Sequence, residues 1–97
     1  MVTRFGEIGA WDVRRVTSFR RLFYGQKDFN EDISSWETLN VTDMYCMFNG
    51  ARSFDQPLEG WNTSNVRDMG SMFVRAPCQK PSWYDADRWE WYLQAHL

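Results

Sequence analysis

The sequence predicts an α/β repeat fold: a short solenoid of three units of about 25 residues, each with a short strand and a short helix, closed by a helical cap. The first observation is a motif that occurs three times, as WDVRRVTSFRRLF, WETLNVTDMYCMF and WNTSNVRDMGSMF. The second is that six apolar positions coincide when the three copies are aligned. The third is that the pattern stops near residue 76. Because repeats of this length stack to bury a common core, we expect a repeat domain over residues 1–76 and a cap over residues 77–97.

The first element of each unit is predicted to be a short extended segment around its tryptophan. In the second unit this segment carries Ile33 and Trp36, and in the third it carries Leu58 and Trp61. Threonines, which favour strands, follow close behind. Stacking the units would pair these segments as a narrow parallel sheet on one side of the core.

The second element is predicted to be a short helix, because Phe19, Leu22 and Phe23 have the spacing of one helical face. Ser18, a residue type that caps helix starts, precedes them, and Gly25, a typical helix stop, follows. A helix of about two turns does not persist alone, so it must dock on the sheet. The equivalent positions in the later units are Asp43, Met44, Met47, Phe48 and Gly50, then Asp68, Met69, Met72 and Phe73.

The tail, PCQKPSWYDADRWEWYLQAHL, is predicted to be a capping helix from about residue 83 to residue 95. Pro81 marks the break before it, and Ser82 with Asp85 three residues later is a variant capping box. Tyr84 and Trp91 fall on the side of this helix that faces away from the third unit. They are either covered by neighbouring chain or exposed as aromatic anchors for a partner, since aromatic residues dominate the energetics of many interfaces.

Charge is distributed unevenly along a chain whose net charge is −2. Residues 1–27 sum to +4 and residues 28–63 to −6. Such polarity bears on partners rather than on fold. Nucleic-acid binding is disfavoured because the basic stretch is short and the acidic stretch would repel phosphate. The residues predicted to dock on carboxylates or anionic lipid head groups, unless they form a merely solvated face, are Arg14, Arg15, Arg20 and Arg21.

The repeated motif resembles the BspA-like leucine-rich-repeat family, in the branch with a 25-residue unit. The stretches FNEDISSWETLNVTDMYCMFNGARSFDQPLEGW and WNTSNVRDMGSMF carry the resemblance, which covers residues 5–76. It implies a leucine-rich-repeat-like solenoid and a role in binding or adhesion, and it implies no catalytic residue. Members include bacterial surface proteins and proteins of unicellular algae. The chain departs from the family in having three units and a tail that does not continue the pattern.

Residues that could carry chemistry are few. His96 stands alone near the chain end and is interpreted as an idle terminal residue. Cys46 is predicted on the outer face of the second helix and Cys78 in the loop after the third unit, and a disulfide and two free thiols are both open. Two cysteines and one remote histidine do not make a zinc site. We expect no catalytic residue, no metal site and no cofactor.

Two further patterns have a functional and a structural interpretation. The acidic loop with Asp28, Glu31 and Asp32 could attract Ca²⁺, but it lacks the ligand spacing of a known calcium loop. Asn40 and Asn62 begin glycosylation sequons. The same asparagines precede the predicted helices, which favours a role in the turn.

These observations predict a non-catalytic protein–protein interaction or structural module, a small accessory or scaffold subunit of a larger assembly. The alternatives are a fragment of a cell-surface adhesin and a carbohydrate- or ion-binding domain. The expected partners are other proteins within a multi-subunit complex, without nucleic acid. No apolar run approaches the length of a transmembrane segment, although peripheral contact with a membrane assembly stays open. The start lacks the pattern of a secretory signal, which favours an intracellular or organellar location.

Overall fold

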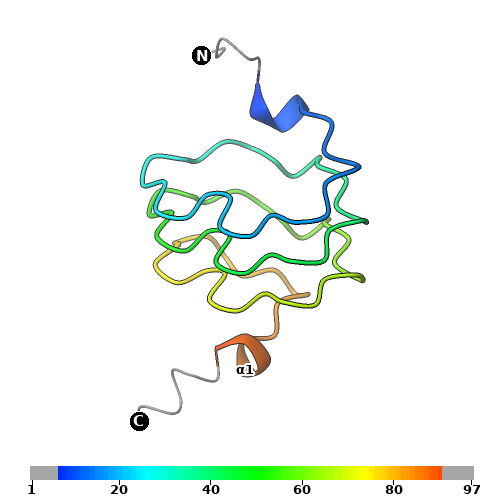
Figure 1. Ribbon diagram of the computed structural model, residues 1–97. Helices are drawn as coiled ribbons and strands as arrows, with labels where there is room; N and C mark the ends of the chain where they lie inside the picture. The colour runs from blue at the N-terminus through cyan, green and yellow to red at the C-terminus, as the bar shows by residue number, and fades with distance from the viewer. Residues whose placement is uncertain (1–6, 91–97) are drawn as a thin grey trace.

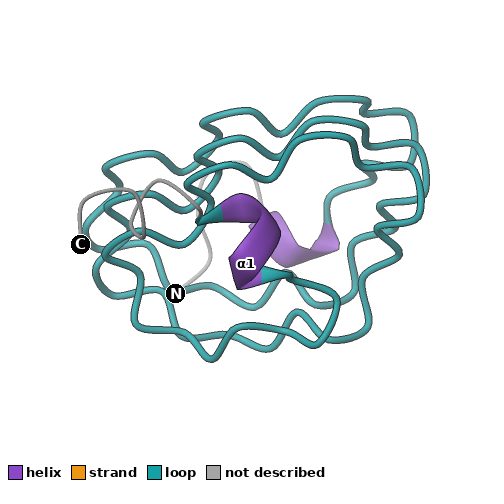
Figure 2. Ribbon diagram, turned by 90° about the horizontal axis from the view of Figure 1, so that it is seen from below, coloured by secondary structure: helices purple, strands orange, loops and turns teal. Residues whose placement is uncertain are grey.

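Three layers of irregular chain follow one another along a common axis in the computed structural model, which describes residues 7–90 (Figure 1). We call residues 11–35 the first layer, residues 36–60 the second and residues 61–76 the third. The described residues contain a 3₁₀ helix, η1 (Ile8–Ala10), and an α-helix, α1 (Ala86–Trp89). The 3₁₀ helix η1 lies beyond the first layer, and α1 lies across the opposite end of the body (Figures 1 and 2).

The predicted α/β solenoid, with a leucine-rich-repeat-like strand and helix in each unit, is wrong. Within residues 7–90 there is no strand and no sheet. The β-pairing between layers is limited to two isolated parallel bridges, Ser18 with Asp43 and Asp43 with Asp68. The segments around the tryptophans pair with nothing as strands. The stretches expected to be helical, near residues 19–24, 44–49 and 69–74, are turns. The body is held together by other means.

Each expected helix is replaced by two consecutive turns. In the first layer the Leu22 N–H donates to the Phe19 carbonyl at 3.0 Å, and the Gln26 N–H donates to the Phe23 carbonyl at 3.1 Å. The third residue of each turn has positive φ, 57° at Arg21 and 69° at Gly25. Turns of this kind need a left-handed residue at that position, whereas a helix needs right-handed residues throughout. A left-handed residue therefore ends any helix before its first complete turn.

The remaining N–H groups of these turns connect the layers. We call residues 18–25, 43–50 and 68–75 the turn ladder. Every second N–H in one layer donates to a carbonyl 24 residues further along the chain, so none of these N–H groups is free to bond four residues back, as a helix requires. The bonds, 2.8–3.0 Å long, run from residues 19, 21, 23 and 25 to the carbonyls of 43, 45, 47 and 49, and from residues 44, 46, 48 and 50 to those of 68, 70, 72 and 74.

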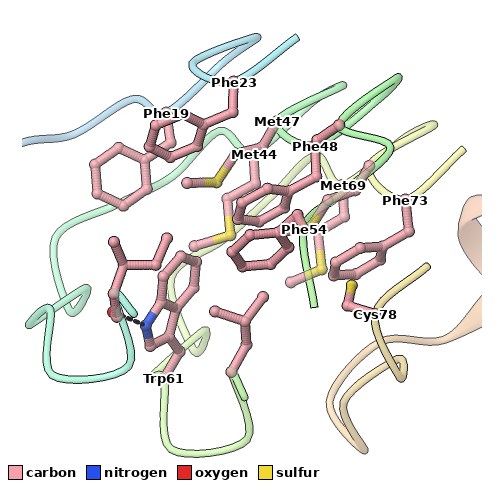
Figure 3. Close-up of a cluster of buried hydrophobic side chains, with 14 of the residues drawn as sticks. Phe19, Phe23, Met44, Met47, Phe48, Phe54, Trp61, Met69, Phe73 and Cys78 are labelled. Atoms are coloured by element: carbon pink, nitrogen blue, oxygen red, sulfur yellow. Dashed lines mark hydrogen bonds between the residues drawn. The ribbon is translucent and has the colours of Figure 1, made fainter. Parts of the chain in front are cut away.

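Aromatic rings stack along the same axis to form the core. Phe23, Phe48 and Phe73 make one column, with ring centroids 5.7 Å apart at both steps. A second column, Phe29 and Phe54, has centroids 5.6 Å apart. The two columns are in direct contact, Phe23 with Phe29 at 3.9 Å and Phe48 with Phe54 at 4.2 Å. The buried methionines Met44, Met47 and Met69 lie beside them (Figure 3). The apolar positions of the repeat are thus core positions, although the backbone that presents them is not the one expected.

Tryptophan side chains link the layers on the side away from the turn ladder. The Nε1–H of Trp36 donates to the Ile8 carbonyl at 2.9 Å. The Nε1–H of Trp61, labelled in Figure 3, donates to the Ile33 carbonyl at 3.1 Å. The indoles of Trp36 and Trp61 stack at 6.3 Å. These bonds tie Trp36 to η1 and Trp61 to the end of the first layer, on the side where the sequence predicted a backbone sheet.

The C-terminal segment covers the third layer with less helix than the sequence predicts. Trp83 continues the tryptophan column, stacking on Trp61 at 6.4 Å, and Tyr84 meets the Phe73 ring edge-on at 4.9 Å. A turn closed by the Tyr84 N–H and the Pro81 carbonyl occupies the expected start of the helix. Both aromatic side chains are thereby directed onto the core.

The predicted capping box at Ser82 is wrong, because Ser82 has another partner. Its N–H donates to Glu59 Oε1 at 2.9 Å and its hydroxyl donates to Glu59 Oε2. Asp85 caps α1 instead, accepting from the Arg88 N–H at 3.2 Å. The predicted continuation of the helix to residue 95 lies outside the described residues.

Candidate functional site

A group of basic and aromatic side chains lies on the outer side of the turn ladder. We call Arg20, Arg21, Tyr24 and Tyr45 the arginine–tyrosine surface. The guanidinium carbon of Arg20 lies 4.3 Å from the centre of the Tyr45 ring, and that of Arg21 lies 5.6 Å from it. Arg21 is also 6.0 Å from the centre of the Tyr24 ring. Such cation–π contacts hold flexible arginines in place at modest energetic gain, about 0.5–1 kcal/mol at exposed sites.

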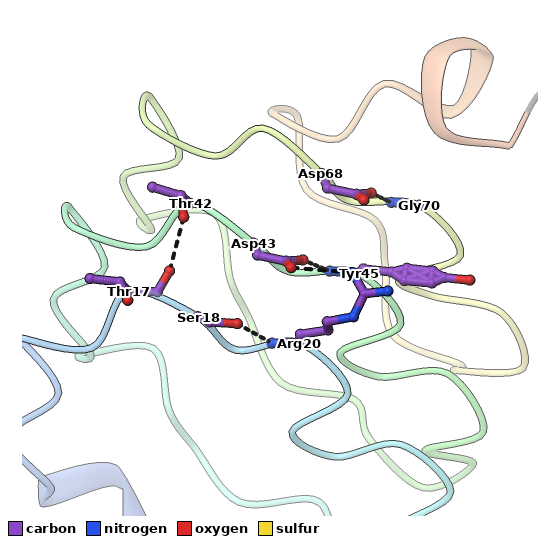
Figure 4. Close-up of polar contacts among 8 residues, drawn as sticks. All are labelled: Thr17, Ser18, Arg20, Thr42, Asp43, Tyr45, Asp68 and Gly70. Atoms are coloured by element: carbon purple, nitrogen blue, oxygen red, sulfur yellow. Dashed lines mark hydrogen bonds and ion pairs between the residues drawn. The ribbon is translucent and has the colours of Figure 1, made fainter.

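Short polar side chains at the start of each ladder segment fix the backbone beneath this surface. Ser18 Oγ accepts from the Arg20 N–H at 3.2 Å, and Asp43 Oδ1 accepts from the Tyr45 N–H at 2.9 Å (Figure 4). Asp68 and Gly70 repeat the contact at 2.9 Å in the third layer. These positions were predicted as helix caps. They do a related task, since Ser and Asp side chains readily accept from N–H groups two residues on.

The charges on the surface are unequally compensated. Arg20 pairs with Asp43, its Nη1 lying 3.2 Å from Oδ2 (Figure 4). Arg21, also exposed, has no ion pair with any residue that the structure describes. An exposed pair such as Arg20–Asp43 contributes little to stability, about 0–1 kcal/mol. The surface therefore presents one partly neutralised and one uncompensated guanidinium beside two phenol rings.

Only two of the four predicted arginines come together. Arg14 turns instead to Asp12, donating from Nε and Nη2 at 2.9 Å. The hydrogen bonds that Arg14 donates from its side chain and backbone lower the pKa of Asp12 to about 2, and the side-chain bonds to the Asp12 carboxylate raise the pKa of Arg14. Arg14 is thus neutralised locally. Arg15 is exposed, and no contact joins it to Arg20 or Arg21.

The two predicted aromatic anchors do not form a site in the described structure. Tyr84 is 7% exposed and packs against Phe73, so of the two alternatives for this residue, burial by neighbouring chain is the correct one. Trp91 lies outside the described residues, as does His96. The structure replaces these anchors with Tyr24 and Tyr45, which sequence reasoning missed. A signal existed: both stand at outward positions of the repeat, where Asn49, Val74 and Gly70 take their places in other layers.

The cysteines offer no reactive centre. Cys46 and Cys78 are both free and both buried. Burial raises the pKa of the Cys78 thiol to about 11, so it stays protonated at neutral pH. The expected exposure of Cys46 on a helix face is wrong, because the segment is a pair of turns in which Cys46 has φ of 55°. Among residues 7–90, no group of three or more His, Cys, Asp or Glu side chains is placed to hold a metal ion.

The two sequon asparagines have structural contacts. Asn40 donates from Nδ2 to the Arg14 carbonyl at 2.8 Å, which links the second layer to the first. Asn62 accepts from the N–H and the hydroxyl of Ser64 through Oδ1 at 3.0 and 2.7 Å. In the described part of the chain, no helix is long and apolar enough to cross a membrane.

Comparison with known proteins gives a family without a function. Residues 1–91 match the model of the family DUF285, described as a Mycoplasma protein of unknown function. That model is not a leucine-rich-repeat model, and the resemblance to BspA-like proteins stays a prediction. No curated protein and no solved structure matches the chain.

Proposed function

We propose that this chain, which belongs to the DUF285 family, is a non-catalytic protein-interaction module that serves as a small accessory or scaffold subunit of a larger assembly. The observation that carries the proposal is the arginine–tyrosine surface. It joins two exposed guanidinium groups to two phenol rings on one side of the turn ladder. Arginine and tyrosine are enriched where proteins bind one another.

The surface differs from the equivalent part of the third layer. The ladder positions of Arg20 and Arg21 are taken by Gly70 and Ser71 there, and Val74 takes the place of Tyr24. The backbone turns are the same in both layers, so the fold does not require arginine or tyrosine at these positions. Their presence in the first layer supports a role beyond folding, and their charge favours a partner that presents carboxylates.

The test measures association of the chain with the assembly from which it is isolated. Because exposed charges mainly steer encounter, the double variant Arg20→Ala with Arg21→Ala should associate about tenfold more slowly and with a weaker dependence on salt. Arg52→Ala is the matched control, since Arg52 is exposed and lies off the turn ladder. Stopped-flow or surface-plasmon measurements give both rates. A native chain that migrates alone at its own mass of 11.6 kDa, with no partner whose binding depends on these arginines, would contradict the proposal.

A further inference from the structure

The first layer ends the turn ladder in a row of hydrogen-bond acceptors. In the second layer, the carbonyls of residues 43, 45, 47 and 49 accept from the first layer. The first layer repeats the same turns, so its equivalent carbonyls point away from the second layer. Within the part of the chain that the structure describes, these carbonyls accept no hydrogen bond. They belong to Ser18, Arg20, Leu22 and Tyr24, and we call them the acceptor edge.

Apolar side chains beside the acceptor edge are also uncovered. Leu22 is 45% exposed, whereas Met47 and Met72, its equivalents in the later layers, are fully buried. The third layer is covered at its far end, because Trp83 and Tyr84 pack against Phe73. Tyr24 is 53% exposed. The body is therefore covered at its C-terminal end and open at the first layer, along both its backbone and its apolar side chains.

A second copy of the chain does not fit this edge. Two first layers facing each other would set carbonyl against carbonyl and arginine against arginine. The third layer does offer free N–H groups, at residues 69, 71, 73 and 75, which donate to no residue in the described structure. The helix α1 lies across that end (Figures 1 and 2), and Trp83 and Tyr84 pack there against Phe73. A copy would have to displace them to reach across.

We propose that the acceptor edge binds an extended, acidic segment of another protein, which donates its own N–H groups to these carbonyls. Proteins often recognise extended peptides in this way, with main-chain bonds supplying affinity and alternate side chains supplying specificity. One face of such a segment would meet Leu22. Carboxylates on the other face would reach Arg21, which has no acidic partner in the described structure. The inference rests on the proposed interaction function and names the class of partner.

The test uses a capped peptide of alternating glutamate and valine as the probe, with two altered forms. In the first form, every second backbone nitrogen is methylated, which removes the donors but keeps the charge. In the second form, lysine replaces glutamate. We expect the probe to shift the ¹³C carbonyl resonances of residues 18, 20, 22 and 24. N-methylation on the ladder-facing positions should weaken binding about tenfold or more, since each lost bond contributes roughly 0.5–1.5 kcal/mol. The lysine form should not bind.

Protein variants separate charge from edge pairing. Arg21→Glu should weaken the probe about tenfold, and Arg52→Glu, its matched control, should leave binding within about twofold. If the probe binds but N-methylation changes nothing, edge pairing is overturned while an interaction function through the arginines stands. If no form binds the folded chain, the acidic extended partner is overturned. Self-association of the wild-type chain that Leu22→Glu abolishes and Leu39→Glu does not would place a second copy on the edge and would overturn the proposal too.

Discussion

Phe48 is the central residue of the core, and its replacement measures how far the layers depend on one another. It is fully buried and stacks on Phe23, Phe54 and Phe73. We expect Phe48→Ala to lower the free energy of unfolding by about 3–5 kcal/mol, the usual loss for a buried phenylalanine. Urea unfolding followed by tryptophan fluorescence measures it. Leu39→Ala, at a residue 51% exposed, is the control and should change stability by less than about 0.5 kcal/mol. Equal unfolding curves for the two variants would contradict the stacked core.

Gly50 and Gly25 test how tightly the layers approach. Both have positive φ, 79° and 69°, the conformation that the third residue of such a turn requires. A Cβ at Gly50 would lie 3.3 Å from the Gly25 Cα, whereas a Cβ at Gly25 would meet nothing within 4 Å. We expect Gly25→Ala to cost about 1–2 kcal/mol, the price of a left-handed alanine, and Gly50→Ala to cost more. The two midpoints of thermal unfolding compare them, and a smaller loss at Gly50 would count against close contact between the layers.

At the scale of residues, much of the core could be predicted and the backbone could not. The coincidence of Phe23, Phe48 and Phe73 at one position identified a buried column before any coordinates. Nothing in the side chains of Arg21 or Cys46 signals positive φ, because left-handed non-glycine residues are uncommon and carry no single chemical signature. The spacing of hydrophobic residues predicts which side chains are buried, but it does not predict the sign of φ.

Among the elements, the tryptophan column offers a test of side-chain hydrogen bonds. Trp61→Phe keeps an aromatic ring between Trp36 and Trp83 but removes the Nε1–H, so the Ile33 carbonyl keeps only the Trp36 N–H as a donor. The expected loss is about 0.5–1.5 kcal/mol, the net contribution of one hydrogen bond. Trp11→Phe should be nearly neutral, because Trp11 is 47% exposed. Chemical denaturation measures the free energy of unfolding of both variants. Equal losses in the two would contradict a structural role for the hydrogen bond of the Trp61 indole.

The contact between Ser82 and Glu59 gives the covering segment a pH dependence. Hydrogen bonds from the Ser82 hydroxyl and N–H lower the pKa of Glu59 below its ordinary value of 4.5. The unfolded chain therefore binds this proton more readily than the folded chain, and the stabilisation is present above pH 4.5 and lost as pH falls through the folded pKa. We expect wild type to lose more stability than Glu59→Gln on acidification below that value. Urea titrations at several pH values across this range measure the stability of both proteins. If the stability of wild type and Glu59→Gln falls in parallel, the Ser82–Glu59 contact is not the source of the pH dependence.

The element that the sequence misidentified is instructive about periodicity. Apolar residues at i, i+3 and i+4 fit one face of a helix, and they also fit two consecutive four-residue turns, as Phe19, Leu22 and Phe23 show. The two cases differ in where the N–H groups bond. A helix satisfies them within the segment, whereas the turn ladder sends every second one to the next layer. The spacing of apolar residues in a single sequence does not distinguish these two bonding patterns. The predicted fold class was therefore wrong, although the predicted repeat length was useful.

For the whole molecule, amide hydrogen exchange should reveal where the ladder ends. The N–H groups of residues 44, 46, 48 and 50 donate to the third layer. Those of residues 69, 71, 73 and 75 have no acceptor in the described structure. Because exchange requires a free N–H, we expect the second set to exchange at least about tenfold faster. Residue-resolved exchange by NMR measures both sets. Equal protection of the two sets would contradict the absence of an acceptor for the third-layer N–H groups.

At the same scale, the candidate site could be predicted only in part. The arginines are visible as a charge excess in residues 1–27, and Arg20 and Arg21 do share a surface. The pairing of Arg14 with Asp12 could not be predicted, because an exposed ion pair depends on local backbone geometry that the residue types alone do not determine. Tyr45 reaches the surface from another layer, and its contact with Arg20 depends on the stacking register.

The one-way bonding of the turn ladder gives the molecule an electrical axis. In a sheet, successive peptide groups alternate in direction and their dipoles largely cancel. Here eight interlayer bonds all run from N–H in one layer to carbonyl in the next, against two in the opposite sense, from Thr42 to Thr17 and from Arg67 to Thr42. Four files of aligned peptide dipoles therefore add, as they do along a helix. The negative pole lies at the first layer, which also holds Arg20 and Arg21. These cations offset the partial negative charge of the free carbonyls, which would otherwise repel an anionic partner.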